Sequence, residues 1–199
     1  MRLDRIKAYL IDLLFILFIF ILCNNLIPRS DKLNKYKSEE RELHESYMEQ
    51  EITLKEYTDK YEVLYYNISS ESKINDLVYI ICLLIYFVVV PYYFHGQTLG
   101  LFLNRLRIER FTIGDLKMWQ LLVRNVVIVG LGYSIFRVIL VYFLAADKYY
   151  KVLLCISALQ VILLLLSWIM VIRKKEKRGL HEIFSNTEVI SLKKKVGKI

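Results

Sequence analysis

The sequence predicts an all-α membrane protein with four transmembrane helices and an extracytoplasmic helical hairpin between the first and the second. The prediction rests on a hydrophobic share of 56%, a mean hydropathy of +0.37 and four long apolar runs that are separated from most of the charged residues. The chain has 199 residues, which suits a single membrane domain over 1–199. With 7 Gly and 2 Pro, the composition excludes collagen-like and low-complexity chains.

Each apolar run is close to the roughly 20 residues that a helix needs to cross about 30 Å of hydrocarbon. Apolar residues occur on every side of these runs, which argues against amphipathic surface helices. The alternative is a buried bundle in a soluble protein, and four such runs in a short chain disfavour it. The predicted spans are 8–27, 77–94, 121–146 and 152–172. Within the third span, Gly130 and Gly132 are candidates for close helix contact.

The distribution of Lys and Arg predicts the orientation. Sixteen of these residues lie in the N-terminal segment, in 95–118 and in the basic tail 173–199, against ten in the two loops on the other side. The positive-inside rule therefore predicts that both termini are cytoplasmic. A cleaved signal peptide is the alternative for the first run, but that run is long and no small-residue cleavage site follows it.

The segment 28–76 is too long for a plain connector and has a net charge of −4. Leu and Tyr residues recur at helical spacing in it, and Thr53 and Glu56 match a capping box. We expect an inserted extracytoplasmic hairpin of two antiparallel helices, at about 31–51 and 53–67. A solvated cap between spans is the favoured interpretation, and a docking arm for a protein partner is the alternative.

Ionisable side chains inside a span are costly and therefore informative. Asp12 lies about 6 Å into the hydrocarbon, and Arg5 is seven residues earlier on the same helix face. Arg124 enters the third span from the same side to nearly the same depth. A lone carboxylate there costs roughly 2.5–3.5 kcal/mol, which pairing reduces. We therefore expect the first and third helices to touch, with Arg5, Asp12 and Arg124 in one buried polar cluster.

Two interpretations of this cluster remain open. A fully paired Asp12 stays ionised and holds helices together, whereas a partly paired Asp12 can take up and release a proton, as ion-coupled carriers require. The sequence does not choose between them.

The sequence offers no basis for an enzyme, a metal site or a cofactor. His44-Glu45 and His181-Glu182 begin like a zinc-protease motif, but Met48 and Ser185 stand where the second His belongs. No nucleophile–base pair or phosphate-binding loop can be assembled from the remaining residues. Nucleic acid is not expected either, because the basic tail lacks aromatic residues for stacking and its Lys side chains suit anionic lipid head groups.

Three short motifs resemble the RDD family of small bacterial membrane proteins. One opens the first span, one follows the second span, and one follows the last. Their residues are, in chain order, Arg5, Ala8, Asp12, Gly96, Thr98, Gly100, Arg178, His181, Glu182 and Thr187. The chain departs from the family at Glu182, where the family has Asp, and at Leu101, where it has Lys.

The resemblance implies a multi-pass protein of the bacterial plasma membrane, with Arg5, Asp12 and Glu182 as its named charged residues. It also implies a carrier or carrier component, with cation/proton exchange proposed for some members. In that reading Arg5 bridges Asp12 and Glu182, and a homo-oligomer forms because four spans enclose a thin pathway. The alternative is a regulatory or scaffold protein that holds a partner through its spans or its hairpin.

Overall fold

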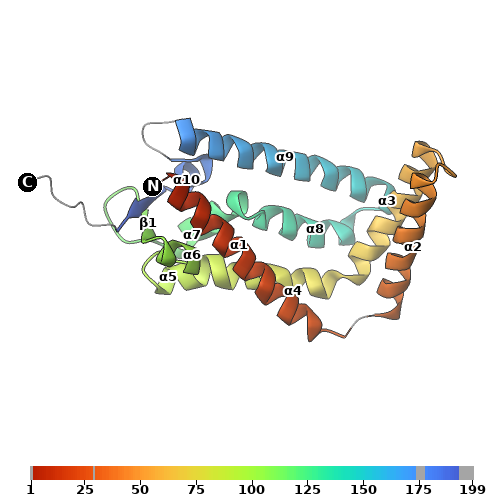
Figure 1. The fold of residues 1–199 in the computed structure, drawn as a ribbon, viewed down its shortest axis with the longest axis horizontal. Helices are drawn as coiled ribbons and strands as arrows, with labels where there is room; N and C mark the ends of the chain where they lie inside the picture. The colour runs from red at the N-terminus through yellow and green to blue at the C-terminus, as the bar shows by residue number, and fades with distance from the viewer. Residues whose placement is uncertain (1, 29, 174–177, 193–199) are drawn as a thin grey trace, which may run out of the picture.

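The computed structural model describes residues 2–28, 30–173 and 178–192, so all of the Lys residues of the predicted basic tail lie outside the described residues. The chain forms an elongated helical bundle (Figure 1). One end, the hairpin end, carries α2 (Asp31–Met48) and α3 (Leu54–Glu71). The other end, the sheet end, carries α6 (Leu99–Leu103), β1 (Leu106–Arg110), α10 (Leu180–Phe184) and β2 (Thr187–Ser191).

Long helices connect the two ends. α1 (Arg2–Asn25) crosses the bundle obliquely, and α9 (Ala146–Arg173) runs along its opposite side (Figure 1). A third long helix is composed of α4 (Lys73–Leu84), the π-helical turn η1 (Ile85–Val89) and α5 (Val90–Tyr93), and it packs against α1. The remaining helices are α7 (Met118–Ile128) and α8 (Leu131–Phe143).

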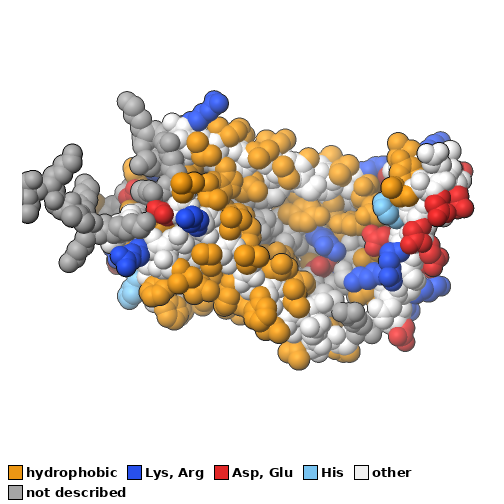
Figure 2. Space-filling model, viewed as in Figure 1, with side chains coloured by type: hydrophobic (Ala, Val, Ile, Leu, Met, Phe, Trp, Pro, Cys, Tyr) orange, Lys and Arg blue, Asp and Glu red, His pale blue; other side chains and the backbone are white. Residues whose placement is uncertain are grey.

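Three segments are long and apolar enough to cross a membrane: Leu3–Asn25, Lys73–Tyr93 and Ala146–Arg173. They match the first, second and fourth predicted spans. Apolar side chains cover α1 and α9 on the face shown in Figure 2, while charged side chains gather at the hairpin end. Because a soluble protein rarely exposes such a large apolar surface, these faces suit a lipid environment.

The third predicted span is broken and is not a continuous helix. α7 and α8 are bent by 80° at the Val129–Gly130 junction and make a fourth span only as a pair. Gly130 has φ +70°, a left-handed conformation that favours glycine and ends α7. A Cβ on Gly130 would meet no atom within 4 Å, so this glycine sets the backbone direction and the expectation of close helix contact there is wrong.

The second span contains a π-helical turn directly before Pro91. Proline has no N–H to donate to the carbonyl of Phe87, so that carbonyl needs another partner inside the bundle. Asn125 supplies it, because its Nδ2 donates to the Phe87 oxygen at 2.8 Å and to the Leu121 oxygen at 2.7 Å. The irregular turn thereby attaches the second span to α7.

A two-stranded antiparallel sheet closes the sheet end, which the all-α prediction did not include. β1 pairs with β2 so that Ile108 faces Val189 and Arg110 faces Thr187. Alternate residues of each strand are buried, among them Leu106, Ile108 and Val189. The sheet binds the chain after the last span to the loop after the second.

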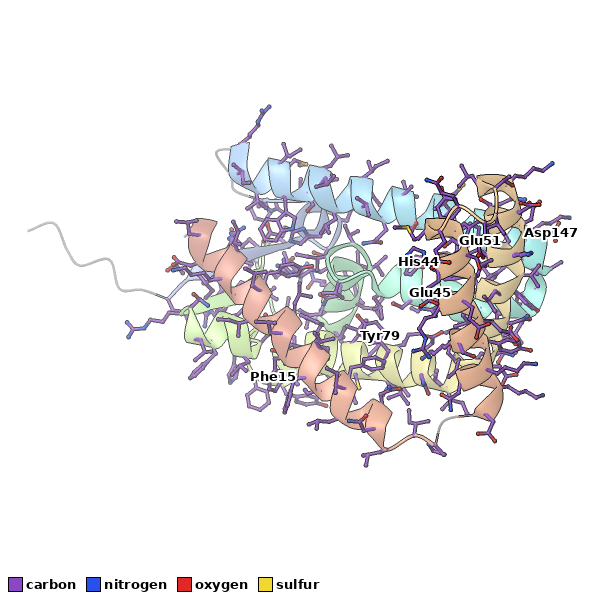
Figure 3. The ribbon with its side chains drawn as sticks, turned by 45° about the vertical axis from the view of Figure 1, so that its right-hand side comes forward. Phe15, His44, Glu45, Glu51, Tyr79 and Asp147 are labelled. Carbon is purple, nitrogen blue, oxygen red and sulfur yellow. The ribbon has the colours of Figure 1, made fainter. Side chains whose placement is uncertain are left out.

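The helices of the segment 28–76 occupy 31–48 and 54–71, close to the predicted ranges. Leu33, Leu64 and Ile68 form the buried contact between them. The predicted capping box at the start of α3 is confirmed: the Glu56 amide donates to Thr53 Oγ1 at 3.3 Å, and the Thr53 amide donates to Glu56 Oε2 at 2.9 Å. Figure 3 labels His44, Glu45 and Glu51 on this hairpin and Asp147 at the start of α9.

Candidate functional site

The carboxylate of Asp12 is held by three donors from the second span and the turn after it. The Tyr86 hydroxyl donates to Oδ1 at 2.5 Å, the Thr98 hydroxyl to Oδ2 at 2.6 Å and the Gly100 amide to Oδ1 at 2.7 Å. Asp12 is 4% exposed, so it lies in the interior of the bundle. Two hydroxyls and an amide thus replace the water that a carboxylate requires.

The local sequence of α6 explains why these donors converge on α1. Thr98 is the N-cap of α6 and accepts from the Leu101 amide at 3.4 Å, while its hydroxyl proton points to Asp12. Gly100 lies against α1: a Cβ there would lie 2.8 Å from the Asp12 carboxyl carbon and would overlap the Ala8 carbonyl oxygen. Gly96 has φ +82° and lies against the backbone of Ile108. The loop 96–100, whose sequence has the pattern Gly-x-Thr-x-Gly, therefore allows α6 to lie close against α1 around Asp12.

Glu182 is the common acceptor of a second buried group. It is completely buried on the short helix α10. Arg5 Nη1 donates to its two oxygens at 3.4 and 3.2 Å, Arg124 Nη1 donates to Oε1 at 3.3 Å, and the Gly179 amide donates to Oε2 at 2.9 Å. Arg5 also donates to the Val189 carbonyl at 2.6 Å. One carboxylate thus connects α1, α7 and α10.

The other tail residues of the predicted set position this carboxylate. His181 is 4% exposed and its Nδ1 shares a hydrogen bond with the Ser167 hydroxyl of α9. Burial, together with Arg124 and Arg5, lowers the pKa of His181 well below its usual 6.5, so the imidazole is neutral at pH 7. Thr187 accepts from Arg124 at 3.3 Å. Arg178 lies over the Phe111 ring at 3.6 Å and donates to the Glu182 carbonyl at 3.1 Å.

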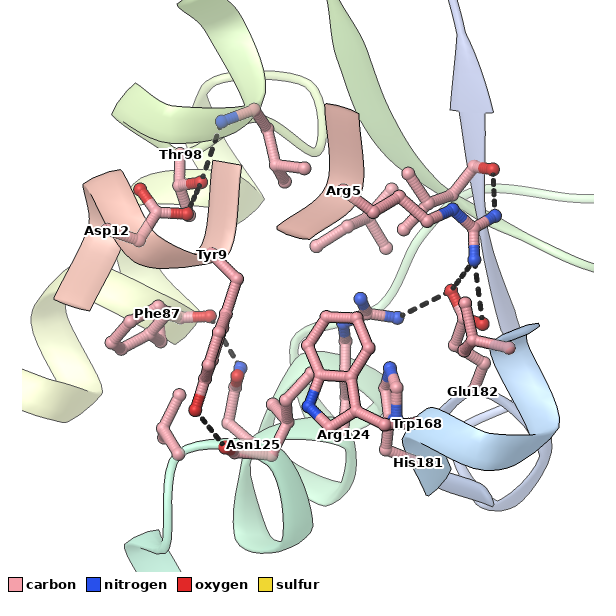
Figure 4. A pocket seen from close by; sticks show the side chains of 16 residues that line it. Arg5, Tyr9, Asp12, Phe87, Thr98, Arg124, Asn125, Trp168, His181 and Glu182 are labelled. Carbon is pink, nitrogen blue, oxygen red and sulfur yellow. Dashed lines mark hydrogen bonds and ion pairs between the residues drawn. The ribbon is translucent and has the colours of Figure 1, made fainter. Parts of the chain in front are cut away.

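A cavity of about 60 Å³ separates the Asp12 group from the Glu182 group (Figure 4). We call it the sheet-end cavity. Tyr9 and Trp168 form one wall and pack edge to face, with ring centroids 5.6 Å apart. Arg5, Asp12, Arg124, Asn125, His181 and Glu182 are among its other lining residues. The volume suits a few water molecules or a small ion, and the lining offers charges of both signs.

The predicted cluster of Arg5, Asp12 and Arg124 is therefore only partly right. The three residues line one cavity, but both guanidinium groups pair with Glu182, and Asp12 binds hydroxyls and an amide. The predicted Arg5–Glu182 contact is present, whereas the bridge from Arg5 to Asp12 is not the arrangement seen. Helical side chains tilt toward the N-terminus, so Arg5 extends away from Asp12, which is about 10 Å further along α1.

Sequence reasoning missed Tyr86 and Gln120. Tyr86 is one of many aromatic residues in the second span, and the sequence gives no sign that its hydroxyl faces Asp12. Gln120 is 1% exposed, and its Nε2 donates to the Ser185 carbonyl at 3.0 Å, joining α7 to the tail. The available signal for Gln120 was a polar amide side chain directly before an apolar span. Among the described residues, no three His, Cys, Asp or Glu side chains are arranged to hold a metal ion.

The apolar helices and the buried charged groups between them define a small polytopic membrane protein with a polar site near one end of its bundle. The sequence profile of the RDD family matches residues 2–186. The chain therefore belongs to the RDD family, as its three motifs indicate. No curated protein and no solved structure matches it at a significant level.

Proposed function

We propose that this RDD family protein is a small carrier, or a component of one, that exchanges a monovalent cation for a proton across the bacterial plasma membrane. The observation that carries the proposal is the sheet-end cavity, which places Asp12, Glu182, Arg5 and Arg124 around one small space among apolar helices. Ionisable groups in such positions are costly, and they commonly mark ion or proton pathways.

Asp12 is the coupling carboxylate in this proposal. Two of its three partners are hydroxyl groups, and a hydroxyl can either donate a proton or offer lone pairs. The Tyr86 and Thr98 hydroxyls can therefore donate to an ionised Asp12 and turn to accept from a protonated one, or offer lone pairs to a cation that replaces the proton. Arg5 and Arg124 adjust the local potential, and the buried Glu182 gates the inner side of the cavity.

The proposal includes an orientation. The sheet end and both termini face the cytoplasm, where Lys and Arg of the loop 95–118 and of the tail meet anionic lipid head groups. Glu182 then gates the cavity on its cytoplasmic side.

The decisive experiment measures ion exchange with purified protein in liposomes. Under an imposed sodium or potassium gradient, the wild type should move protons, and Asp12→Asn should abolish this movement. Asp147→Asn is the matched control, because Asp147 is exposed in the first turn of α9 and lies far along the chain from the cavity. Absence of proton movement in the wild type, or unchanged movement in Asp12→Asn, contradicts the proposal.

A scaffold or regulatory role is the second candidate, and the hairpin supports it. α2 and α3 extend beyond the spans and present charged side chains of both signs (Figure 2). A photo-reactive residue at exposed Glu42 should cross-link to a different membrane protein in cells if this role holds. Recovery of only self-contacts, or no cross-link, counts against it.

A further inference from the structure

A second cavity lies at the α7–α8 break. It has a volume of about 230 Å³ and is lined by Asp76, Tyr79, Val129, Gly130, Tyr133, Ser134, Arg137 and Gln160. We call it the hairpin-end cavity; Tyr79, on its wall, is labelled in Figure 3. Val129 lines both this cavity and the sheet-end cavity. The two cavities therefore approach each other at one residue.

Most of the surface of the hairpin-end cavity is apolar, but charged and hydroxyl groups are among the side chains that line it. Arg137 Nε lies 3.3 Å from Asp76 Oδ2. The Tyr133 and Tyr65 hydroxyls are 3.4 Å apart, and Ser134 Oγ donates to the Gly130 carbonyl at 3.2 Å. Such a lining can replace part of the hydration shell of a small cation.

The break itself is held by side chains from two other spans. The carbonyls at the end of α7 lose their helical partners at Gly130, and inside a membrane such groups must find others. Tyr9 of α1 donates to the Ile128 carbonyl at 2.9 Å, and Gln160 of α9 donates to the Val127 carbonyl. Irregular backbone at this depth is tolerated where it is buried in protein or lines a cavity, and here it does both.

We propose that the pathway for a small cation runs through a single chain, from the sheet-end cavity past the α7–α8 break into the hairpin-end cavity, with Val129 as the barrier between them. This inference rests on the proposed carrier function for the identity of the ion. Its geometric content is independent of that function: the hairpin-end cavity opens to water, and Val129 separates it from the cavity around Asp12.

Cysteine accessibility tests the water-filled cavity without any transport measurement. In full-length protein with Cys23, Cys82 and Cys155 replaced by Ala, Ser134→Cys should react with a membrane-impermeant methanethiosulfonate reagent added on the hairpin side only. Phe136→Cys is the control, because Phe136 is half-exposed on the apolar surface of α8 and lines neither cavity. Equal reactivity at the two positions, or none at Ser134→Cys, overturns the inference.

Proton leak through liposomes tests the barrier. Val129→Ala should raise the leak about tenfold over the wild type, corresponding to a barrier lowered by about 1.4 kcal/mol, and the increase should persist in an Asp12→Asn background. Val138→Ala is the control, because Val138 packs against the same apolar cluster as Val129 but lines neither cavity, and its leak should stay at the wild-type level. If the proton leak of Val129→Ala equals that of the wild type, Val129 is not the barrier, whether or not the wild type exchanges ions. If the leak of Val129→Ala rises but the wild type exchanges no ions, the proposed function is wrong and the barrier stands.

Discussion

At the scale of single residues, Glu182 organises the charges at the sheet end. Its carboxylate accepts from two buried guanidinium groups and one amide. Glu182→Gln should lower the free energy of unfolding in detergent by about 3–5 kcal/mol, because it removes the carboxylate from two buried cations. Glu182→Asp keeps the charge on a shorter side chain and should lose less. Equal thermal stability of Glu182→Gln and the wild type would contradict this role.

His181 predicts how stability depends on pH. Its pKa is lowered in the folded protein by burial and by the two arginines, so the unfolded chain binds more protons below about pH 6.5. Stability is therefore full above pH 6.5 and falls as the pH decreases, by at most about 1.4 kcal/mol per pH unit. Unfolding measured between pH 7.5 and 5 should show this slope, and His181→Gln should reduce it. An unchanged slope in the variant would assign the dependence to other groups.

The residue-level predictions from sequence succeeded only in part. The contact of Arg5 with Glu182 was expected from the family resemblance and from their positions at one side of the spans, whereas the expected pairing of the arginines with Asp12 was wrong. The partners of Asp12 could not be predicted, because hydroxyls and backbone amides occur throughout the chain and only the fold brings Tyr86, Thr98 and Gly100 to one carboxylate.

At the scale of elements, the α1–α6 contact depends on the absence of a side chain. Gly100→Ala places a methyl group against the Ala8 carbonyl and the Asp12 carboxyl carbon, so α6 must move away from α1. We expect a loss of about 1–3 kcal/mol in unfolding free energy, as for other overpacked sites. Gly132→Ala is the control. Its Cβ would lie 3.1 Å from the end of the Val126 side chain, which can shift, whereas the Cβ at Gly100 meets backbone, so Gly132→Ala should lose less stability. A similar loss in both variants would show that the α1–α6 contact has no special role.

The capping box gives a prediction confined to the hairpin. Thr53→Ala removes the acceptor for the Glu56 amide and should speed hydrogen exchange in the first turn of α3 about fivefold. The Thr53 hydrogen bonds lower the pKa of Glu56, so this contribution is present at neutral pH and is lost as the pH falls through that pKa. Unchanged exchange in α3, or equal acceleration in α2, would argue against a local cap.

Elements were predictable from sequence to the extent that hydropathy and helical spacing report them. The spans on α1, α4 and α9 and the two helices of the segment 28–76 follow from those signals. The break at Gly130 does not, because hydropathy is insensitive to backbone dihedral angles. β1 and β2 have only five residues each. The one sequence pattern that indicates β1 is the alternation of Leu106 and Ile108 with charged residues.

At the scale of the whole molecule, the two ends of the bundle should be exposed on opposite sides of a membrane. Ser38 lies on α2 at the hairpin end, and Phe184 is exposed on α10 at the sheet end. In the cysteine-free background, Ser38→Cys should react with an impermeant reagent outside intact cells, and Phe184→Cys only after the cells are opened. The opposite pattern would reverse the proposed orientation, and extraction of the protein by alkaline carbonate would contradict membrane integration itself.

The position of Glu182 along the chain has a consequence for biogenesis. Arg5 and Arg124 enter the bilayer with α1 and α7, yet the carboxylate that pairs with both follows the last span. During synthesis these two cations must wait for a partner that leaves the ribosome after all of the spans. The sheet end can therefore reach its final packing only after α9 and the segment that carries α10 have left the ribosome, so this end assembles after the spans.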